Sequence, residues 1–299
     1  YLDFKTAIGQ FLVGYQNFVA FGTNFADSHH TKPGVKWLFP IGDTLIGAAW
    51  EQNRENSSVP YVGPGNQGTA SDSDKSVYDL FVIQKFKGGD AGLLFQYLRD
   101  AANSDVGNVK TKVYVIDPYV KATIGPVFVE AEMLYGGGKY ADYSKPSTAQ
   151  DVDLKAWGAY IGAKATFGPL YVGGMFAWIS GDDPDTLDEK EGGVSAVFGF
   201  GQVFSPCLIL WNDPTSTWMG GLTGYGTASV ANYMDNAWFY GLYVGYKPIP
   251  KLDVRLAGYY AKADEKPAGY VEKDYGYEAD LTATYKIYDN LEYMIGVGY

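Results

Sequence analysis

Two pairs of acidic residues have a spacing that could support chemistry on one face of a strand. Glu130 and Glu132 form one pair, and Glu278 and Asp280 form the other. Alternate residues of a strand point to the same side, so each pair would place two carboxylates next to each other. Such pairs can attract cations, bind a divalent ion or act as acid and base. We favour solvated or ion-paired carboxylates, because nothing in the sequence supplies a matching substrate cleft.

Other residues suited to chemistry are sparse. The adjacent His29 and His30 have no further ligands near them and make a poor zinc site. Residues 182–191 are acidic, but their spacing does not match an EF-hand loop. We expect an external loop there, solvated or bridged to lipopolysaccharide by divalent ions. A phosphate loop, a nucleophile elbow and a Cys-x-x-Cys-His haem motif are all missing from the sequence. We therefore predict no catalytic residue, no metal site, no cofactor and no enzymatic activity.

Composition narrows the class of protein. The 299 residues carry a net charge of −11, which makes nucleic acid an unfavourable partner. One cysteine excludes an internal disulfide framework, and no clean apolar run of about 20 residues indicates a membrane helix. The 26 tyrosines and 38 glycines exceed what a soluble core needs. Tyrosine suits a membrane–water interface, and glycine permits the bends of a closed sheet.

Apolar and polar residues alternate with a period of two in many segments. In residues 277–287, Tyr277, Leu281 and Tyr285 belong to one row, and Glu278 and Asp280 belong to the other. Residues 127–135 and 157–167 show the same pattern. These segments run for about 9–12 residues, and a tilted strand needs about 9–11 residues to cross a bilayer. The pattern predicts two-faced membrane strands.

Short turns alternate with long polar connections. Seven short connections carry Gly, Pro, Asp or Asn near residues 9, 42, 89, 125, 168, 249 and 289. Long polar segments, which we expect to be loops, lie between them at residues 22–32, 53–76, 102–112, 136–153, 181–193 and 264–276. This rhythm is typical of outer-membrane barrels. We predict one all-β domain over residues 1–299, a transmembrane antiparallel up-and-down β-barrel with at least fourteen strands. Pro118 is awkward inside one of these strands. The first and last connections are both short, so we expect a fragment of a barrel with sixteen or more strands.

The polar face of the strands should line a lumen. The candidate pore-lining residues are Lys36, Glu51, Asp117, Lys121, Glu130, Glu132, Lys164, Arg255, Glu278 and Asp280. Charges of both signs on a barrel wall tune its preference for ions. An open channel is the favoured interpretation; the alternative is a plugged barrel whose interior charges pair with each other.

Residues 194–235 are the least regular part of the sequence and are apolar for an exposed loop. One hypothesis is a constriction loop that folds into the lumen and carries Cys207, Trp211, Asp213 and Trp218. The alternative is one more hairpin, which would begin with a strand over residues 194–203 and extend the barrel. The sequence leaves the two interpretations even.

Two stretches carry a family resemblance. The first stretch begins with residues 259–269, which read Tyr-Tyr-Ala-Lys-Ala-Asp-Glu-Lys-Pro-Ala-Gly, and continues with residues 275–278 and 281–291. The second stretch is residues 205–213, which read Ser-Pro-Cys-Leu-Ile-Leu-Trp-Asn-Asp. They resemble porin-like outer-membrane β-barrel proteins of anaerobic metal-reducing delta-proteobacteria, over about a third of the chain. The resemblance implies a barrel in the bacterial outer membrane, in contact with lipids and lipopolysaccharide. It also implies passive diffusion of small hydrophilic solutes or ions, with a homotrimer as one possible assembly. An alternative function is a barrel sheath that holds a multihaem cytochrome partner for electron export.

Overall fold

The alternating segments form long strands in the computed structural model of the chain. The structure describes residues 1–18, 21–27, 31–55, 73–102, 109–143, 148–201, 203–211, 234–266 and 271–299. The elements in this part are β1 (Leu2–Thr6), β2 (Gly9–Asn17), β3 (Thr31–Ile41), β4 (Thr44–Arg54), β5 (Lys75–Phe86), β6 (Gly89–Asp100), β7 (Val109–Ile124), β8 (Val127–Tyr143), β9 (Val152–Phe167), β10 (Leu170–Ile179), β11 (Glu189–Lys190), α1 (Val194–Phe198), β12 (Ala237–Ile249), β13 (Leu252–Lys262), β14 (Asp274–Tyr288) and β15 (Leu291–Gly298).

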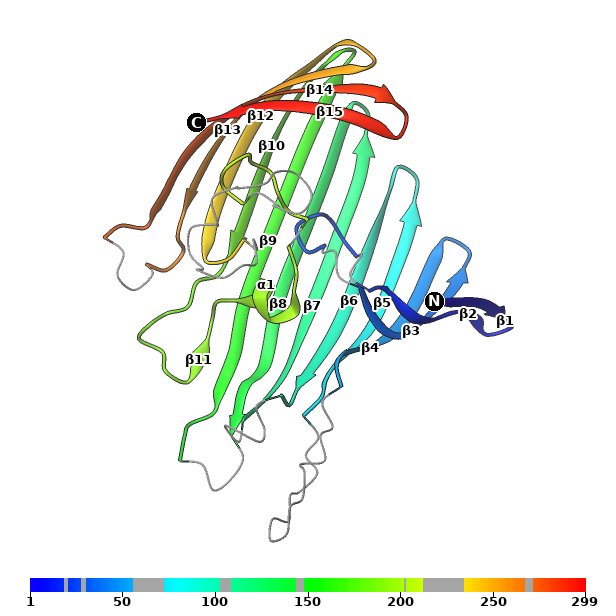
Figure 1. Ribbon diagram of the computed structural model, residues 1–299, viewed down its shortest axis with the longest axis vertical. Coiled ribbons are helices and arrows are strands. Elements are labelled where there is room, and N and C mark those ends of the chain that lie inside the picture. Colours follow the sequence, from blue (N-terminus) through cyan, green and yellow to red (C-terminus); the bar gives the residue numbers. More distant parts are fainter. Residues whose placement is uncertain are drawn as a thin grey trace, which may run out of the picture.

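One sheet contains all of these strands (Figure 1). Fourteen of them pair antiparallel in chain order, and the two-residue β11 pairs in parallel with the start of β9. The predicted all-β antiparallel up-and-down architecture, with at least fourteen strands, is thereby confirmed. Within the described residues, β1 and β15 are the two edges of the sheet and do not pair with each other.

The seven predicted short turns all join neighbouring strands. Gly42, Gly125 and Gly168 lie in these turns with φ near +60°, and a Cβ at any of them would meet no other atom within 4 Å. Glycine is therefore needed at these positions for its backbone freedom rather than for lack of space. The expected boundaries were wrong by several residues at some strand ends, most of all at β8, which continues to Tyr143 into the segment expected to be a loop over residues 136–153.

Pro118 is accommodated inside β7 by an interruption of one ladder. It pairs with Leu93 of β6, but the register towards β8 passes from Ile116↔Tyr135 directly to Tyr119↔Glu132. Proline has no N–H to donate, so it fits where a ladder is already broken.

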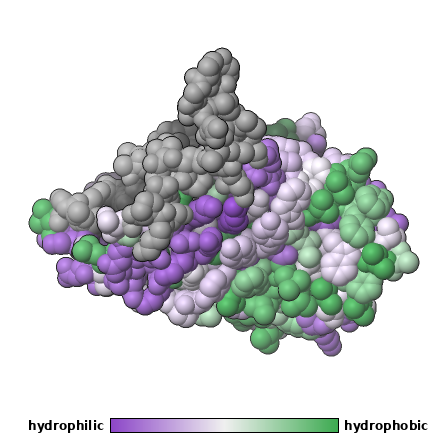
Figure 2. Space-filling view, turned by 90° about the horizontal axis from the view of Figure 1, so that it is seen from below, coloured by the Kyte–Doolittle hydropathy of each residue, from purple (hydrophilic) through white to green (hydrophobic). Residues whose placement is uncertain are grey.

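The outer face of the sheet exposes large apolar side chains. Leu80 is 57% exposed, Leu242 is 73% exposed and Ile295 is 59% exposed. Figure 2 shows hydrophobic residues gathered over one part of the surface and hydrophilic residues over another. Soluble proteins rarely expose large contiguous apolar patches, whereas the outside of a membrane barrel is an apolar band. This face is therefore suited to lipid.

Tyrosine rings form a row across this outer face. The rings of Tyr240 and Tyr260 stack at 6.2 Å between centroids, and those of Tyr260 and Tyr277 stack at 4.7 Å. The three residues lie on β12, β13 and β14. Aromatic rows of this kind mark the membrane–water interface of barrels.

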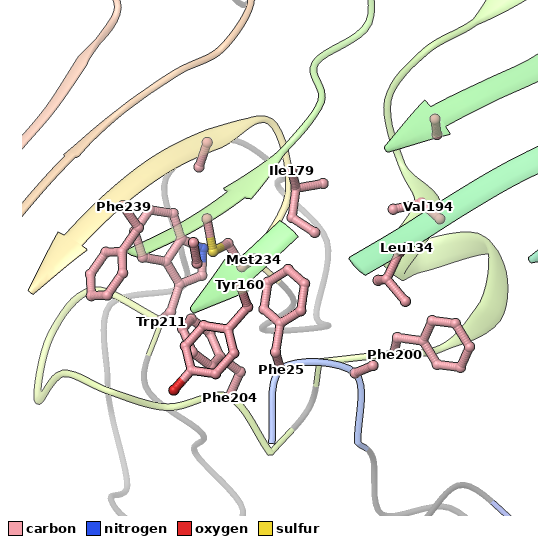
Figure 3. Close-up of a cluster of buried hydrophobic side chains, with 14 of the residues drawn as sticks. Phe25, Leu134, Tyr160, Ile179, Val194, Phe200, Phe204, Trp211, Met234 and Phe239 are labelled. Atoms are coloured by element: carbon pink, nitrogen blue, oxygen red, sulfur yellow. The ribbon is translucent and has the colours of Figure 1, made fainter. Parts of the chain in front are cut away.

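The buried core lies on the opposite, inner face. Two segments outside the long strands cover this face: the first inward segment (Phe18 and residues 21–27) and the second inward segment (residues 194–211, without 202). Their side chains pack against strand residues such as Leu134, Tyr160 and Phe239 (Figure 3). The described residues contain no helix long and apolar enough to cross a membrane.

Candidate functional site: the lumen and its inward segments

The ten predicted pore-lining residues lie on strands of the sheet and point to its inner face. Lys36 is on β3, Glu51 on β4 and Lys164 on β9. The others are Asp117 and Lys121 on β7, Glu130 and Glu132 on β8, Arg255 on β13, and Glu278 and Asp280 on β14. Period-two alternation thus brings them to one side.

Five of these ten side chains are buried. Their exposed fractions are 2% for Glu51, 1% for Asp117, 3% for Glu132, 3% for Glu278 and 4% for Asp280. The sequence pattern predicted carboxylates facing a water-filled lumen, but these five contact folded chain instead. Burial of a carboxylate is costly unless donors surround it. Two of them, Glu132 and Glu278, accept hydrogen bonds from the backbone of the inward segments.

Glu132 holds the first inward segment. Its Oε1 accepts the backbone N–H of Thr23 at 3.1 Å, and its Oε2 accepts the Thr23 hydroxyl at 2.6 Å and the Ala26 N–H at 3.2 Å. The Lys121 Nζ donates to the carbonyl oxygen of Gly22 at 2.8 Å. Gly22 has φ +75°, and a Cβ there would lie 1.6 Å from Glu132 Oε1, so only glycine permits this approach.

Glu278 holds the second inward segment in the same way. Its Oε1 accepts the N–H groups of Leu208 at 2.9 Å and Ile209 at 2.7 Å, and its Oε2 accepts that of Leu210 at 2.7 Å. Asp280 Oδ2 also accepts the Leu208 N–H at 3.0 Å. Three successive N–H groups that converge on a carboxylate form an anion-binding nest. The segment is therefore anchored to β14 through its own backbone.

The predicted constriction loop is described only in part. Residues 194–201 and 203–211 pack on the inner face, while Asp213 and Trp218 lie outside the described residues. The alternative of a strand over residues 194–203 is wrong, because Val194–Phe198 forms α1. Cys207 is 5% exposed and Trp211 is 2% exposed. Burial, followed by the charges of Glu278 and Asp280, raises the pKa of the Cys207 thiol.

The two inward segments contact each other. The Val203 N–H donates to the carbonyl oxygen of Asp27 at 3.2 Å. The rings of Phe25 and Phe204 meet edge to face at 5.5 Å, and Phe25 also stacks on Tyr160 at 5.5 Å. The segments are anchored at Glu132 and at Glu278, and through these contacts they pack together over part of the inner face.

Three adjoining cavities lie between the second inward segment and the short turns. They measure about 240, 310 and 330 Å³, and they share wall residues such as Lys164, Arg255 and Pro206. Gly168 and Pro169, of the short turn between β9 and β10, line one of them. We call the three cavities together the polar chamber.

Tyrosines hold many of the charges of the polar chamber in place. Tyr160 donates to Glu130 Oε1 at 2.7 Å, and Tyr171 donates to Asp253 Oδ1 at 2.8 Å. The Arg255 guanidinium lies 4.3 Å from the centroid of the Tyr243 ring. These contacts fix charges of both signs along the wall of the polar chamber. Charges of both signs on a barrel wall tune its preference for ions.

A second contact of Arg255 reaches the second inward segment. Its Nη2 donates to the Tyr259 hydroxyl at 2.9 Å, and that hydroxyl donates to the carbonyl oxygen of Pro206 at 2.6 Å. The chamber wall and the segment are therefore mechanically connected.

Sequence reasoning missed the first inward segment. The sequence predicts a polar loop over residues 22–32, and no local pattern marks Thr23 as the partner of a carboxylate. The signal was present in Phe18, Phe21 and Phe25, because three aromatic residues at the start of an exposed loop are unexpected.

Comparison with known proteins gives similarity in structure alone. No protein-family model and no curated protein matches the sequence. Among solved structures, the outer-membrane protein OpdK of Pseudomonas aeruginosa superposes with a TM-score of 0.53 at 10% identity, over 99% of this chain and 73% of its own. OccK5 (OpdH) of the same organism gives 0.52 at 12% identity, over 99% and 79%. OccAB4 of Acinetobacter baumannii gives 0.50 at 11% identity, over 97% and 67%.

The fold is that of a bacterial outer-membrane barrel. At these identities the likeness shows the fold alone. It agrees with the predicted location in the bacterial outer membrane and with the apolar outer face. The narrower lineage, the metal-reducing delta-proteobacteria, stays a prediction.

Proposed function

We propose that this chain forms an outer-membrane channel for passive diffusion of small hydrophilic solutes or ions. The observation that carries the proposal is the arrangement of the inner face. Two inward segments, anchored at Glu132 and Glu278, cover part of it, and the polar chamber lies between them and the short turns. An apolar outer face with a polar, partly narrowed interior is what a solute channel needs.

The second inward segment is the element that we expect to narrow the path. It reaches from α1 over Phe204 to the Glu278 nest, and its Pro206 borders two of the cavities of the polar chamber. A solute that moves along the chamber would therefore pass this segment. We expect the permeation rate to depend on how firmly the segment is held.

Single-channel recording in planar bilayers tests the proposal. We expect a higher conductance after deletion of residues 205–221, because the narrowing element is removed. A shorter control deletion of residues 183–188, in the acidic connection between β10 and β11, should leave the conductance near that of the unmodified protein. An unchanged conductance after the first deletion would remove the constriction from the account.

The sheath for a multihaem cytochrome finds no support in the described residues. A sheath needs a wide lumen free of chain, whereas the inward segments are packed and anchored on the inner face. A homotrimer and contacts with lipopolysaccharide stay predictions. Cross-linking in native membranes would check the first, and binding of lipopolysaccharide in the presence of divalent ions the second.

A further inference from the structure

A separate cavity of about 180 Å³ lies between the first inward segment and the inner face of β3–β7. Much of its wall is apolar: Phe18, Phe21, Phe81, Phe200, Leu94 and Ile83 are among the lining residues. Its polar lining consists of Lys36, Asp79, Gln96 and Asp117. A largely apolar pocket with a few convergent polar groups is the usual form of a small-molecule site.

Three of the four polar residues have partners in the protein. Asp79 Oδ1 accepts the Gln96 Nε2 at 2.8 Å. The Lys36 Nζ donates to the carbonyl oxygen of Asn17 at 3.0 Å and lies 5.2 Å from the centroid of the Phe18 ring. These groups are satisfied by the chain itself.

Asp117 is the exception. It is 1% exposed, and neither of its carboxylate oxygens has a hydrogen-bond donor among the described residues. The group beside it is the carboxyl of Glu132, which already accepts bonds from Thr23 and Ala26 and can hydrogen-bond to Asp117 only when the two carboxyls share a proton. A buried carboxylate without donors is costly, so its presence in a cavity wall requires an explanation.

We propose that this cavity binds a small organic cation, a protonated primary amine with a compact apolar body. The ammonium group supplies the donors that Asp117 lacks, and the body lies among the phenylalanine rings. Charge-assisted hydrogen bonds to a buried carboxylate and cation–π contacts with rings are the two strongest ways to bind an ammonium group.

Size and charge both fit this class of ligand. A dry cavity of about 150 Å³ holds benzene, so a cavity of about 180 Å³ has room for a ring with an aminomethyl group. The lining residues include two carboxyl groups, those of Asp79 and Asp117, and one ammonium group, that of Lys36. This balance of charges disfavours an anion as the ligand. No group of three or more metal-ligating residues occurs in the part of the chain that the structure describes, so a metal ion is a poorer fit.

Isothermal titration of the full chain in detergent micelles tests the proposal, with benzylamine and benzyl alcohol as probes of equal size. After subtraction of binding to empty micelles, we expect benzylamine to bind at neutral pH at least about tenfold more tightly than the alcohol. Equal binding of both would mean that Asp117 and Glu132 share a proton and that no cation is recognised. Absence of binding would mean that the cavity holds only water. Either result overturns the proposal.

Two variants locate the site. Asp117→Asn keeps the size of the side chain and should lower the affinity for benzylamine by about tenfold to a hundredfold, since a charge-assisted hydrogen bond is lost. Ala49→Leu leaves Asp117 intact but fills the cavity, which Ala49 lines, and should abolish binding. Glu292→Gln, an exposed carboxylate on β15, is the control and should bind as the unmodified protein does. Unchanged affinity in both cavity variants, with strand content verified by circular dichroism, would refute the site.

Discussion

Replacement of Glu278 by glutamine should release the second inward segment. The carboxylate accepts three backbone N–H groups at 2.7–2.9 Å while only 3% exposed. Glutamine keeps one acceptor oxygen but turns an NH₂ group towards N–H donors. Each hydrogen bond to a charged group contributes about 1.5–3 kcal/mol, and the three are not additive. We expect the docking of the segment to lose about 2 kcal/mol or more.

The single cysteine of the chain provides the assay. Cys207 is 5% exposed and lies next to Leu208, which Glu278 binds. If a thiol reagent reacts only with the released segment, a loss of about 2 kcal/mol accelerates the reaction about thirtyfold. Hydrogen exchange at the amides of Leu208, Ile209 and Leu210 should accelerate by a similar factor.

Two comparisons separate release from electrostatics. Removal of a carboxylate also lowers the pKa of the neighbouring thiol, which would speed the reaction without any movement. Hydrogen exchange at the amides does not depend on the thiol pKa. Release of the segment is therefore shown only if thiol modification and amide exchange both accelerate. Glu132→Gln, which loosens the first segment, should accelerate exchange at Thr23 and Ala26 and leave Cys207 far less affected. Protected amides at residues 208–210 in Glu278→Gln would refute the reasoning.

Further perturbations test other parts of the structure. Gly22→Ala should destabilise the first inward segment by about 1–3 kcal/mol, measured as the thermal midpoint in detergent, because φ is +75° and a Cβ meets Glu132; an unchanged midpoint would contradict the placement of Gly22. Leu242→Arg should cost about 2–4 kcal/mol of folding free energy into bilayers, whereas Leu187→Arg, in an 85% exposed loop position, should be nearly neutral. Equal effects of the two would argue against a lipid-facing β12. Tyr259→Phe removes the bond to Pro206 and should weaken docking of the second segment by about 1 kcal/mol in the Cys207 assay. Tyr171→Phe, whose hydroxyl binds Asp253 on the wall, is its control and should leave that rate unchanged.

The strands and turns could be predicted because their signals are local. Alternation with a period of two identifies strands such as β9 and β14 and assigns their faces, and glycine marks turns such as those at Gly42 and Gly168. The same alternation placed the ten charged residues on the inner face. Pro118, which argued against a continuous strand, fits because the ladder towards β8 skips it.

The inward segments could not be derived in this way, because their contacts are distant in sequence. Thr23 and Glu132 are separated by 109 residues, and Leu208 and Glu278 by 70. No local pattern shows that a carboxylate on a strand will accept backbone N–H groups of a remote loop. The five residues of α1 are too few for a helical period to be recognised. Hence the sequence indicated carboxylates in an open lumen where the structure has two anchors.

The most direct test of the central claim is the single-channel conductance of the unmodified protein in planar bilayers, measured with a reversal potential under a salt gradient. The account predicts a stable, ohmic conductance, since the proposed channel requires a water-filled path that passes the inward segments by way of the polar chamber. Folded protein that inserts into bilayers yet carries no current would contradict it and would indicate a plugged or purely structural barrel.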